Sequence, residues 1–234
     1  MKVGIIAAME EELDLLIKNL SDYKEIHFGQ FKYYTGKINE VEVALLLCGI
    51  GKVNAAVGAT LLIDKLLPDY LINTGVAGGF PEKLKVGDIV VSTEVRHHDA
   101  DATVFDYEIG QIPRMPAAFK SDKTLVKFAE EVSLEEKNVS VYSGPILSGD
   151  SFVHHPKQID KIIERFPNIM AVEMEGAAIA QTSYLFNIPF VLIRSISDKV
   201  HEVGSSDIYK EFMQTAAENS VKIVLQLLNK LKEK

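Results

Sequence analysis

The chain has one cysteine, no long apolar run and no excess of positive charge. Cys48 cannot form a disulfide within the chain, which favours a reducing compartment and therefore the cytoplasm. No run approaches the roughly 18 consecutive apolar residues of a membrane span, so we expect no contact with a membrane. Lys2 and the short apolar run Val3–Met9 are followed by three glutamates, where a signal peptide needs a longer apolar region. We therefore expect no export signal.

The formal net charge of −8 excludes several classes of partner. A chain this acidic repels phosphate backbones and anionic lipids, so we expect no nucleic-acid partner and no membrane-surface partner. With 234 residues, of which 47% are hydrophobic and 25% charged, the chain can bury a sizeable core. It contains no internal repeat, low-complexity tract or Pro/Gly/Ser linker. The sequence predicts one domain over residues 1–234 and a small-molecule ligand.

Short β-rich runs alternate with segments of helical period, which predicts the α/β class with a largely parallel sheet covered by helices. Strands are expected over Lys2–Ala8, Glu25–Phe28, Lys32–Lys37, Val41–Cys48, Tyr70–Thr74, Asp88–His97, Val141–Leu147, Met170–Met174 and Phe190–Ile196. Helices are expected over Glu10–Leu20, Val53–Leu66, Lys123–Glu131, Gln158–Arg165, Gly176–Phe186 and Ser206–Lys232. The stretch Asp99–Phe119 has no period and predicts a long loop, and loops of that length are usually functional or disordered.

Acidic residues follow three apolar strands directly, and in α/β sheets ligands bind beyond the carboxyl ends of the strands. The first group is Glu10-Glu11-Glu12 after the run Gly4–Met9. All three could simply favour the positive end of the following helix, and for Glu10 and Glu11 that explanation suffices. Glu12 is a candidate for catalysis.

The second group is Glu173-Met174-Glu175, where a strand passes into a helix rich in small residues. In an extended segment the two carboxylates share one face, because the period of a strand is two residues. Such a carboxylate can accept hydrogen bonds from the paired hydroxyls of a ribose, and Met174 offers an apolar surface. The alternative is that these acids serve only the helix N-terminus.

The third group is Arg194-Ser195-Ile196-Ser197-Asp198, at the end of an apolar strand. A buried arginine must be paired, so Arg194 implies a carboxylate or another acceptor nearby, either in a functional site or in a purely structural pair. Apolar surroundings would raise the pKa of Asp198 and keep it protonated as an acid.

Other motifs argue against cofactors and metals. Two glycine clusters follow strands, but Asn54 replaces the third glycine of a dinucleotide fingerprint, and Val53 follows Gly51-Lys52 where a phosphate loop needs Ser or Thr. The residues His97-His98-Asp99 are of metal-ligand types, yet their spacing matches no standard zinc pattern. No nucleophile elbow is present. We expect neither a cofactor nor a metal, and no covalent catalysis.

Taken in order, these segments resemble the 5'-methylthioadenosine/S-adenosylhomocysteine nucleosidases of the nucleoside phosphorylase superfamily. The resemblance covers nearly the whole chain, through Gly4–Glu12, Gly49–Val53, Asn73–Gly79, Leu84–Val90, His98–Asp101, Ser148–Asp150, Val172–Glu175 and Arg194–Asp198. It implies a three-layer α/β/α domain with a central mixed sheet, adenine nucleosides as substrates, no cofactor, and a homodimer.

The resemblance also implies roles for individual residues. Asp198 would protonate N7 of adenine and Glu12 would activate water. Glu175 would hold the ribose hydroxyls, and Arg194 would support the water and Glu12. The remaining contacts to the substrate would come from Met9, Ile50, Val76, Ala77, Gly78, Ser151, Phe152, Val153, Glu173, Met174, Ser197 and Tyr209, with Phe105 and Pro113 from the partner subunit. Within that set, Phe152 would stack on adenine, Val153 would offer it backbone bonds, and Met9, Ile50 and Tyr209 would line the 5' side.

Two positions depart from the family pattern. Val76 stands where many relatives carry serine, which removes a hydroxyl that could help to position the water. Asp106 stands between Phe105 and Tyr107 where glycine is more usual. Two other functions remain open: a purine nucleoside phosphorylase, which the acidic Glu10–Glu12 segment argues against, and a non-catalytic nucleoside-binding or sensor protein. Among substrates, 5'-deoxyadenosine and 6-amino-6-deoxyfutalosine also stay open.

Overall fold

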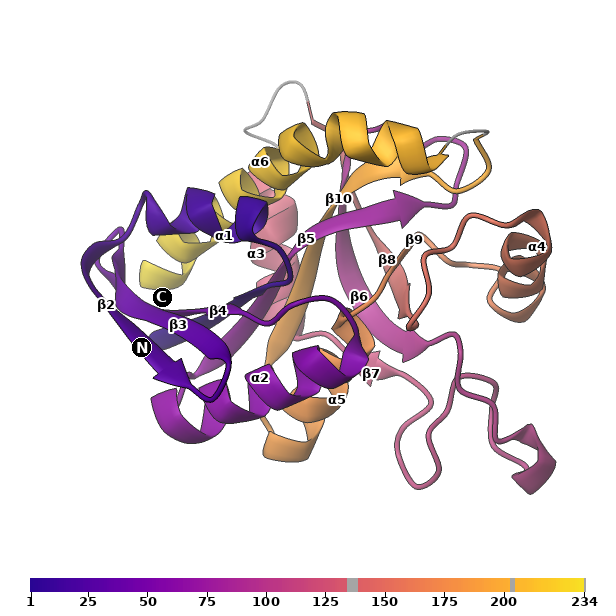
Figure 1. Ribbon diagram of the computed structural model, residues 1–234, viewed down its shortest axis with the longest axis horizontal. Helices are drawn as coiled ribbons and strands as arrows, with labels where there is room; N and C mark the ends of the chain where they lie inside the picture. Colours follow the sequence, from indigo (N-terminus) through magenta and orange to yellow (C-terminus); the bar gives the residue numbers. More distant parts are fainter. Residues whose placement is uncertain (134–138, 203–204, 234) are drawn as a thin grey trace.

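The structure, a computed structural model, describes residues 1–133, 139–202 and 205–233 (Figure 1). Its strands are β1 (Lys2–Ala7), β2 (Ser21–Phe28), β3 (Phe31–Ile38), β4 (Val41–Leu47), β5 (Tyr70–Gly79), β6 (Ile89–His97), β7 (Phe119–Lys120), β8 (Val141–Ser148), β9 (Ala171–Glu173) and β10 (Phe190–Lys199). Its helices are α1 (Glu10–Ile17), α2 (Lys52–Leu66), α3 (Lys123–Ser133), α4 (Pro156–Arg165), α5 (Gly176–Phe186), α6 (Ser205–Lys232) and the short 3-10 helix η1 (Thr103–Phe105).

The strands form one mixed sheet in the order β10-β6-β8-β9-β5-β1-β4-β3-β2, with β7 paired to β6. Among the described residues, parallel and antiparallel strand pairs are equally frequent, so the sheet is mixed rather than largely parallel. Strand β10 pairs with both β5 and β6, which closes that half of the sheet on itself. The closed half brings β5, β9 and β10 together around one end of the sheet.

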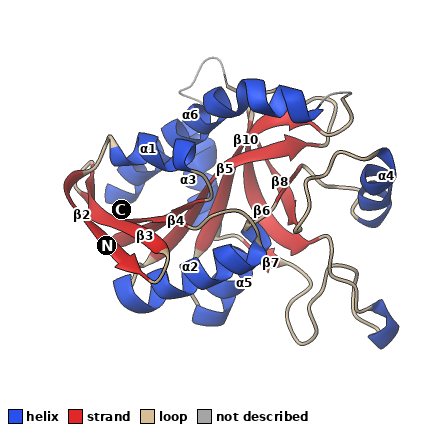
Figure 2. Ribbon diagram, viewed as in Figure 1, coloured by secondary structure: helices blue, strands red, loops and turns tan. Residues whose placement is uncertain are grey.

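Two apolar cores lie on opposite faces of the sheet, which gives three layers (Figure 2). Helices α1, α3 and α6 cover one face through residues such as Leu16, Leu125 and Leu227. Helices α2 and α5 cover the other through residues such as Leu62 and Ile179. The interior strands are buried on both sides, and β1 is apolar along its length for that reason. The predicted α/β class and the three-layer mixed-sheet fold are confirmed.

The ends of several elements differ from those that the sequence predicts. Strands β5 and β10 continue to Gly79 and Lys199, beyond the predicted ends at Thr74 and Ile196, because each supplies the hydrogen-bonding partner that the other needs. Helix α1 ends at Ile17 instead of Leu20. Strand β7, which has only two residues, interrupts the end of the predicted loop. Among the described residues, no helix is both long enough and apolar enough to cross a membrane.

Candidate active site

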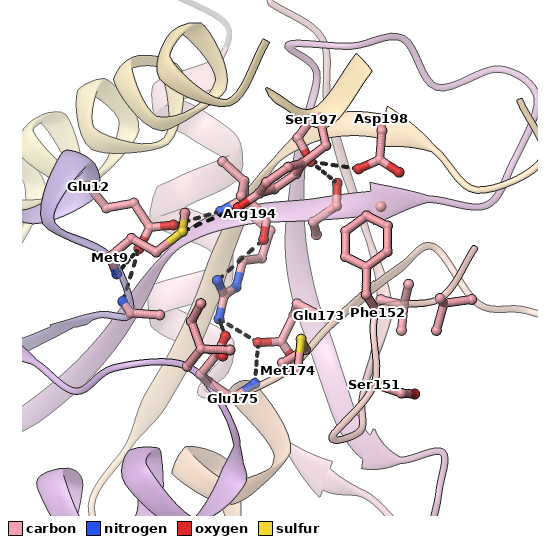
Figure 3. A pocket seen from close by; sticks show the side chains of 18 residues that line it. Met9, Glu12, Ser151, Phe152, Glu173, Met174, Glu175, Arg194, Ser197 and Asp198 are labelled. Carbon is pink, nitrogen blue, oxygen red and sulfur yellow. Dashed lines mark hydrogen bonds and ion pairs between the residues drawn. The ribbon is translucent and has the colours of Figure 1, made fainter. Parts of the chain in front are cut away.

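A cavity of about 270 Å³ opens where β1 ends and where the extended parts of β5 and β10 run past β9 (Figure 3). The cavity is lined by Ala8, Met9, Glu12, Ile50, Val76, Ala77, Gly78, Ser151, Phe152, Val153, Val172, Glu173, Met174, Glu175, Arg194, Ser197, Asp198 and Tyr209. Ala8 and Val172 are the lining residues that the sequence analysis did not predict as substrate contacts. The three acidic groups that it singled out meet here, although they come from distant parts of the chain.

Glu12 lies in the first turn of α1 and is almost fully buried. Its Oε2 accepts hydrogen bonds from the backbone amides of Ala8 (2.9 Å) and Met9 (3.2 Å), and its Oε1 accepts one from the amide of Val76 (3.3 Å). Burial raises the pKa of Glu12, while the nearby Arg194 charge and the three amide donors oppose that rise. Glu10 and Glu11 do not line the cavity.

Gly75 makes room for this arrangement. It lies opposite Arg194 in the pairing of β5 with β10. A Cβ atom at this position would lie 2.7 Å from Glu12 Oε1 and still closer to Arg194 Nη1. The glycine therefore allows a carboxylate and a guanidinium to approach the same piece of backbone.

Arg194 is 1% exposed and is the cation that the sequence predicts to be paired. Its Nη2 donates to Glu173 Oε2 and to Asn73 Oδ1, both at 2.5 Å, and lies 3.7 Å from Glu175 Oε2. Its Nη1 donates to the carbonyl of Val76 at 3.4 Å. These partners fix the orientation of the guanidinium, which a buried charge requires.

Glu173 is occupied by protein donors. Its Oε1 accepts from the Ser148 hydroxyl, and its Oε2 accepts from the amides of Glu175 (3.1 Å) and Gly176 (2.7 Å) besides Arg194. Ser148 is itself held, because its Oγ accepts from the amide of Ala177 at 2.7 Å. Glu173 therefore anchors Arg194 and the start of α5, and its predicted contact with a substrate stays a prediction.

Among the described residues, Glu175 accepts fewer hydrogen bonds from the protein than Glu173 does. Its Oε1 accepts a hydrogen bond from the amide of Gly51 at 2.9 Å. Burial and the charge of Glu173 raise the pKa of Glu175, and Arg194 opposes them. The side chain is buried and lines the cavity, and its predicted hydrogen bonds to the ribose hydroxyls stay a prediction.

A β-bulge aims Asp198 into the cavity. In the pairing of β10 with β5, Ile196 lies opposite Ala77 and Asp198 lies opposite Gly78, so Ser197 is the extra residue. Such a bulge redirects the side chains that follow it. Asp198 Oδ1 accepts a hydrogen bond from the Ser197 hydroxyl at 2.8 Å. Burial raises the pKa of Asp198, the Ser197 donor opposes that rise, and the charge of Glu202 adds to it.

Apolar and aromatic side chains complete the walls of the cavity. The Tyr209 hydroxyl donates to Met9 Sδ at 3.2 Å, and the Tyr209 ring meets the Phe152 ring edge-on with centroids 5.7 Å apart. Val153 is buried, whereas Phe152 is 39% and Ile50 is 53% exposed. The cavity is therefore open on the side where Phe152 and Ile50 lie.

Phe105 and Pro113 lie outside the cavity of their own chain. Both belong to residues 99–118, hereafter the arm, which extends away from the sheet (Figure 1) and contacts the start of α2 through the Asp99–Lys52 pair and α4 through the Asp101–Arg165 pair. Phe105 is 72% exposed in the short helix η1. Their predicted placement in the cavity of a partner subunit stays a prediction.

The histidines near the arm serve the packing of the chain. His97 and His98 are buried, and burial lowers the pKa of each. One ring nitrogen of His97 lies 3.0 Å from Gln181 Oε1. Within the described ranges, no group of three or more His, Cys, Asp or Glu side chains is arranged to hold a metal ion.

Comparison with known proteins gives a consistent result over the whole chain. The model of the phosphorylase superfamily matches residues 2–229. A 5'-methylthioadenosine/S-adenosylhomocysteine nucleosidase of Maridesulfovibrio salexigens is 67% identical over 231 residues, which cover 99% of this chain and 100% of the relative.

Two solved structures share the fold and the family. The nucleosidase of Neisseria meningitidis in complex with methylthio-immucillin-A superposes with a TM-score of 0.95 at 43% identity, covering 97% of this chain and 98% of that one. The nucleosidase of Colwellia psychrerythraea in complex with adenine gives a TM-score of 0.95 at 44% identity, covering 98% and 95%. The chain belongs to the phosphorylase superfamily and, within it, to the 5'-methylthioadenosine/S-adenosylhomocysteine nucleosidases.

Proposed function

We propose that the chain hydrolyses the N-ribosidic bond of 5'-methylthioadenosine and S-adenosylhomocysteine, and so releases adenine and the corresponding thioribose product. The observation that carries this proposal is the pair of buried carboxylates, Glu12 and Asp198, on opposite sides of one cavity (Figure 3). Loss of adenine leaves an oxocarbenium-like sugar, which needs a proton for the leaving base on one side and an activated water on the other. The names of the relatives support the same reaction.

Asp198 is the general acid in this proposal. Burial raises its pKa, which favours the protonated carboxyl group that this proposal needs to protonate N7 of adenine. Phe152 and Val153, on the same side of the cavity, would stack on the base and offer it backbone hydrogen bonds. Ser197 supports Asp198 through its hydrogen bond.

Glu12 is the general base. Its backbone donors and the nearby Arg194 stabilise the ionised form, so Glu12 can take a proton from water and hold it after the attack. Glu175 would accept hydrogen bonds from the 2'- and 3'-hydroxyls, with Met174 packed on the sugar. Arg194 keeps this group of carboxylates together.

The charge of the cavity favours water over phosphate as the nucleophile. Four acidic side chains line it, those of Glu12, Glu173, Glu175 and Asp198, of which Asp198 carries a proton in this proposal, and Arg194 is the single Lys or Arg among the described lining residues. Arg194 is also engaged by protein acceptors. A phosphate ion needs an electropositive cradle, so a phosphorylase reaction is disfavoured.

Adenine release from 5'-methylthioadenosine, followed by chromatography with and without inorganic phosphate, tests the reaction. We expect free adenine and free methylthioribose at a rate that does not depend on phosphate. A sugar 1-phosphate, or a rate that rises with phosphate, would show a phosphorylase instead. Binding of the nucleoside without any release would show a sensor protein. The same assay with 5'-deoxyadenosine and 6-amino-6-deoxyfutalosine would rank the substrates.

The working form in this proposal is a homodimer in which each arm covers the open side of the partner's cavity. Exposed apolar side chains support it: Val104 and Phe105 on the arm are 81% and 72% exposed, and Val53 on the neighbouring α2 is 74% exposed. Phe105 and Pro113 would then meet Met9, Ile50 and Tyr209, and form an apolar slot for the 5' substituent. The buried thiol of Cys48 supports work in a reducing cytoplasm.

The slot predicts a preference for thioethers over adenosine. Burial of each methylene group favours the free energy of binding by about 0.8 kcal/mol, whereas burial of a 5'-hydroxyl without a hydrogen-bond partner weakens binding. We expect Phe105→Ala to raise KM for 5'-methylthioadenosine more than KM for adenosine. Equal increases would indicate general damage. A fully active monomer in analytical ultracentrifugation would contradict the contribution of the partner subunit.

A further inference from the structure

Most residues of the segment that would bind adenine are partly or fully exposed. Residues 149–155, hereafter the base segment, connect β8 to α4 without regular secondary structure. The segment supplies Ser151, Phe152 and Val153 to the cavity. Val153 is buried, but Phe152 is 39% exposed. Hydrogen bonds must therefore fix much of its position.

Asp150 anchors the base segment to two distant parts of the chain. Its backbone amide donates to Asp99 Oδ2 at 3.0 Å, and its Oδ1 accepts from the backbone amide of Lys52 at 2.8 Å. The ammonium of Lys52 donates to Asp99 Oδ1 at 2.6 Å. The three residues thus form a closed ring of contacts, hereafter the clasp.

The clasp also reaches the ribose side of the cavity. Lys52 is the first residue of α2, and the amide of the preceding Gly51 donates to Glu175 Oε1 at 2.9 Å. Two adjacent amides at the start of α2 therefore hold two carboxylates, one from the base segment and one that faces the sugar. A Cβ atom on Gly51 would lie 3.3 Å from Asp150 Oδ1, so the approach is close.

The Asp99–Lys52 pair is suited to this task. Its side chains are only 32% and 20% exposed, so water screens the pair less than a fully exposed one. Burial alone would raise the pKa of Asp99, but the donors from Lys52 and Asp150 lower it. Asp99 is thus charged at neutral pH and holds one partner on each oxygen.

We propose that Asp99, Lys52 and Asp150 are positioning residues that set the distance between the adenine-binding segment and the ribose-binding Glu175. The inference rests on the proposed function for the identity of the ligand. Misplacement of a binding group by about 1 Å can cost about 100-fold in rate, so a clasp remote from the reacting atoms can still govern catalysis.

The test compares Asp99→Asn and Lys52→Met with Asp101→Asn as the matched control. Asp101 is two residues further along the same loop, and it pairs with Arg165 at 3.4 Å away from the cavity. Calorimetric titration with adenine measures the base site directly, kinetics with 5'-methylthioadenosine separate KM from kcat, and thermal unfolding reports damage to the fold.

We expect Asp99→Asn and Lys52→Met to weaken adenine binding by about tenfold, the size of one hydrogen bond to a charged group. The KM for 5'-methylthioadenosine should rise together with the dissociation constant for adenine. The double variant should bind adenine no more weakly than the single variants, because both substitutions break the same clasp. Lys52→Arg should restore most of the affinity. Asp101→Asn should bind adenine like the wild type at a similar melting temperature.

Unchanged adenine binding in both clasp variants would overturn the inference, and so would an equal loss in Asp101→Asn. If Asp99→Asn fails to fold, Lys52→Met decides, because it leaves the backbone amide of residue 52 in place. If the wild-type protein neither binds nor releases adenine, the proposed function fails instead. The wild-type titration therefore separates failure of the proposed function from failure of the clasp.

Discussion

Two buried acidic side chains, Glu12 and Asp198, face one cavity, and they differ in their hydrogen-bond donors and in the charges nearby. Glu12 accepts hydrogen bonds from three backbone amides and lies near the Arg194 charge. Among the described residues, Asp198 has one donor, the hydroxyl of Ser197, and Arg194 is not among the charges that shift its pKa. Burial raises the pKa of both, but Arg194 and three backbone amides oppose that rise at Glu12, whereas the Ser197 hydroxyl opposes it at Asp198. This difference supports the proposed roles, in which Asp198 carries the proton and Glu12 accepts one.

The largest expected effect is the removal of the acid by Asp198→Asn. An amide can still donate a hydrogen bond to N7, but it cannot deliver a proton, so we expect kcat to fall by about 100-fold or more. Steady-state assay of adenine release measures this loss. A variant that keeps more than about a tenth of the wild-type kcat would reject Asp198 as the general acid.

Glu12→Gln should remove the base with a comparable or somewhat smaller loss of turnover, about 100-fold. Nucleoside binding should survive, because the base acts on water and contributes little to holding the ligand. Calorimetric titration with the substrate checks this separation. If binding were lost together with activity, Glu12 would be a ligand-contact or folding residue rather than the base.

Gly75→Ala should disturb the surroundings of Glu12, the general base of the proposal, while leaving Asp198 in place. A Cβ atom would lie 2.7 Å from Glu12 Oε1, so Glu12 or Arg194 must move, and we expect kcat to fall by about tenfold or more. Gly79→Ala is the control for an added Cβ on the same strand, since its Cβ would meet Ile196 at 3.1 Å outside the cavity. Gly75 also has a φ of +153°, so alanine at that position adds backbone strain to the loss of space. Similar activity in the two variants would mean that the space at Gly75 is unimportant.

The smallest effect, on pH dependence, sharpens the comparison. Activity requires Asp198 protonated and Glu12 ionised, so the rate should fall at high pH through Asp198 and at low pH through Glu12. The Ser197 donor lowers the pKa of Asp198, and its removal in Ser197→Ala should raise that pKa. We expect the alkaline limb of the kcat/KM profile to move to higher pH, with the acidic limb unchanged. Movement of the acidic limb alone would reverse the two roles.

The sequence predicted the elements of the fold well, because strands such as β1 and helices such as α2 have clear apolar patterns. It did not predict that β5 continues through Gly75 and Gly79, since glycine-rich segments normally indicate loops and only the pairing with β10 extends the strand. The equal mixture of parallel and antiparallel pairs also depends on contacts between strands that are distant in sequence.

In the site, too, the sequence predicted what local patterns indicate and missed contacts between residues distant in sequence. The sequence predicted that Arg194 needs a carboxylate or another acceptor nearby, and Glu173 accepts its hydrogen bond at 2.5 Å. It could not predict the other contacts of that cluster, because Asn73 and Ser148 are ordinary polar residues until the fold brings them to Arg194 and Glu173. The clasp likewise joins residues about a hundred positions apart, Lys52 and Asp150, for which no local pattern exists.

The donors that hold Glu12 belong to the main chain of Ala8, Met9 and Val76, so no substitution at these positions other than by proline deletes them directly. Position 76 can therefore carry valine without loss of the hydrogen bond from its backbone amide to Glu12. Its side chain instead packs with Ala216 and Ala217 of α6 and faces the cavity. For protein engineering, substitutions of the side chain at residue 76 can therefore reshape the wall of the cavity while the backbone amide still holds the Glu12 side chain.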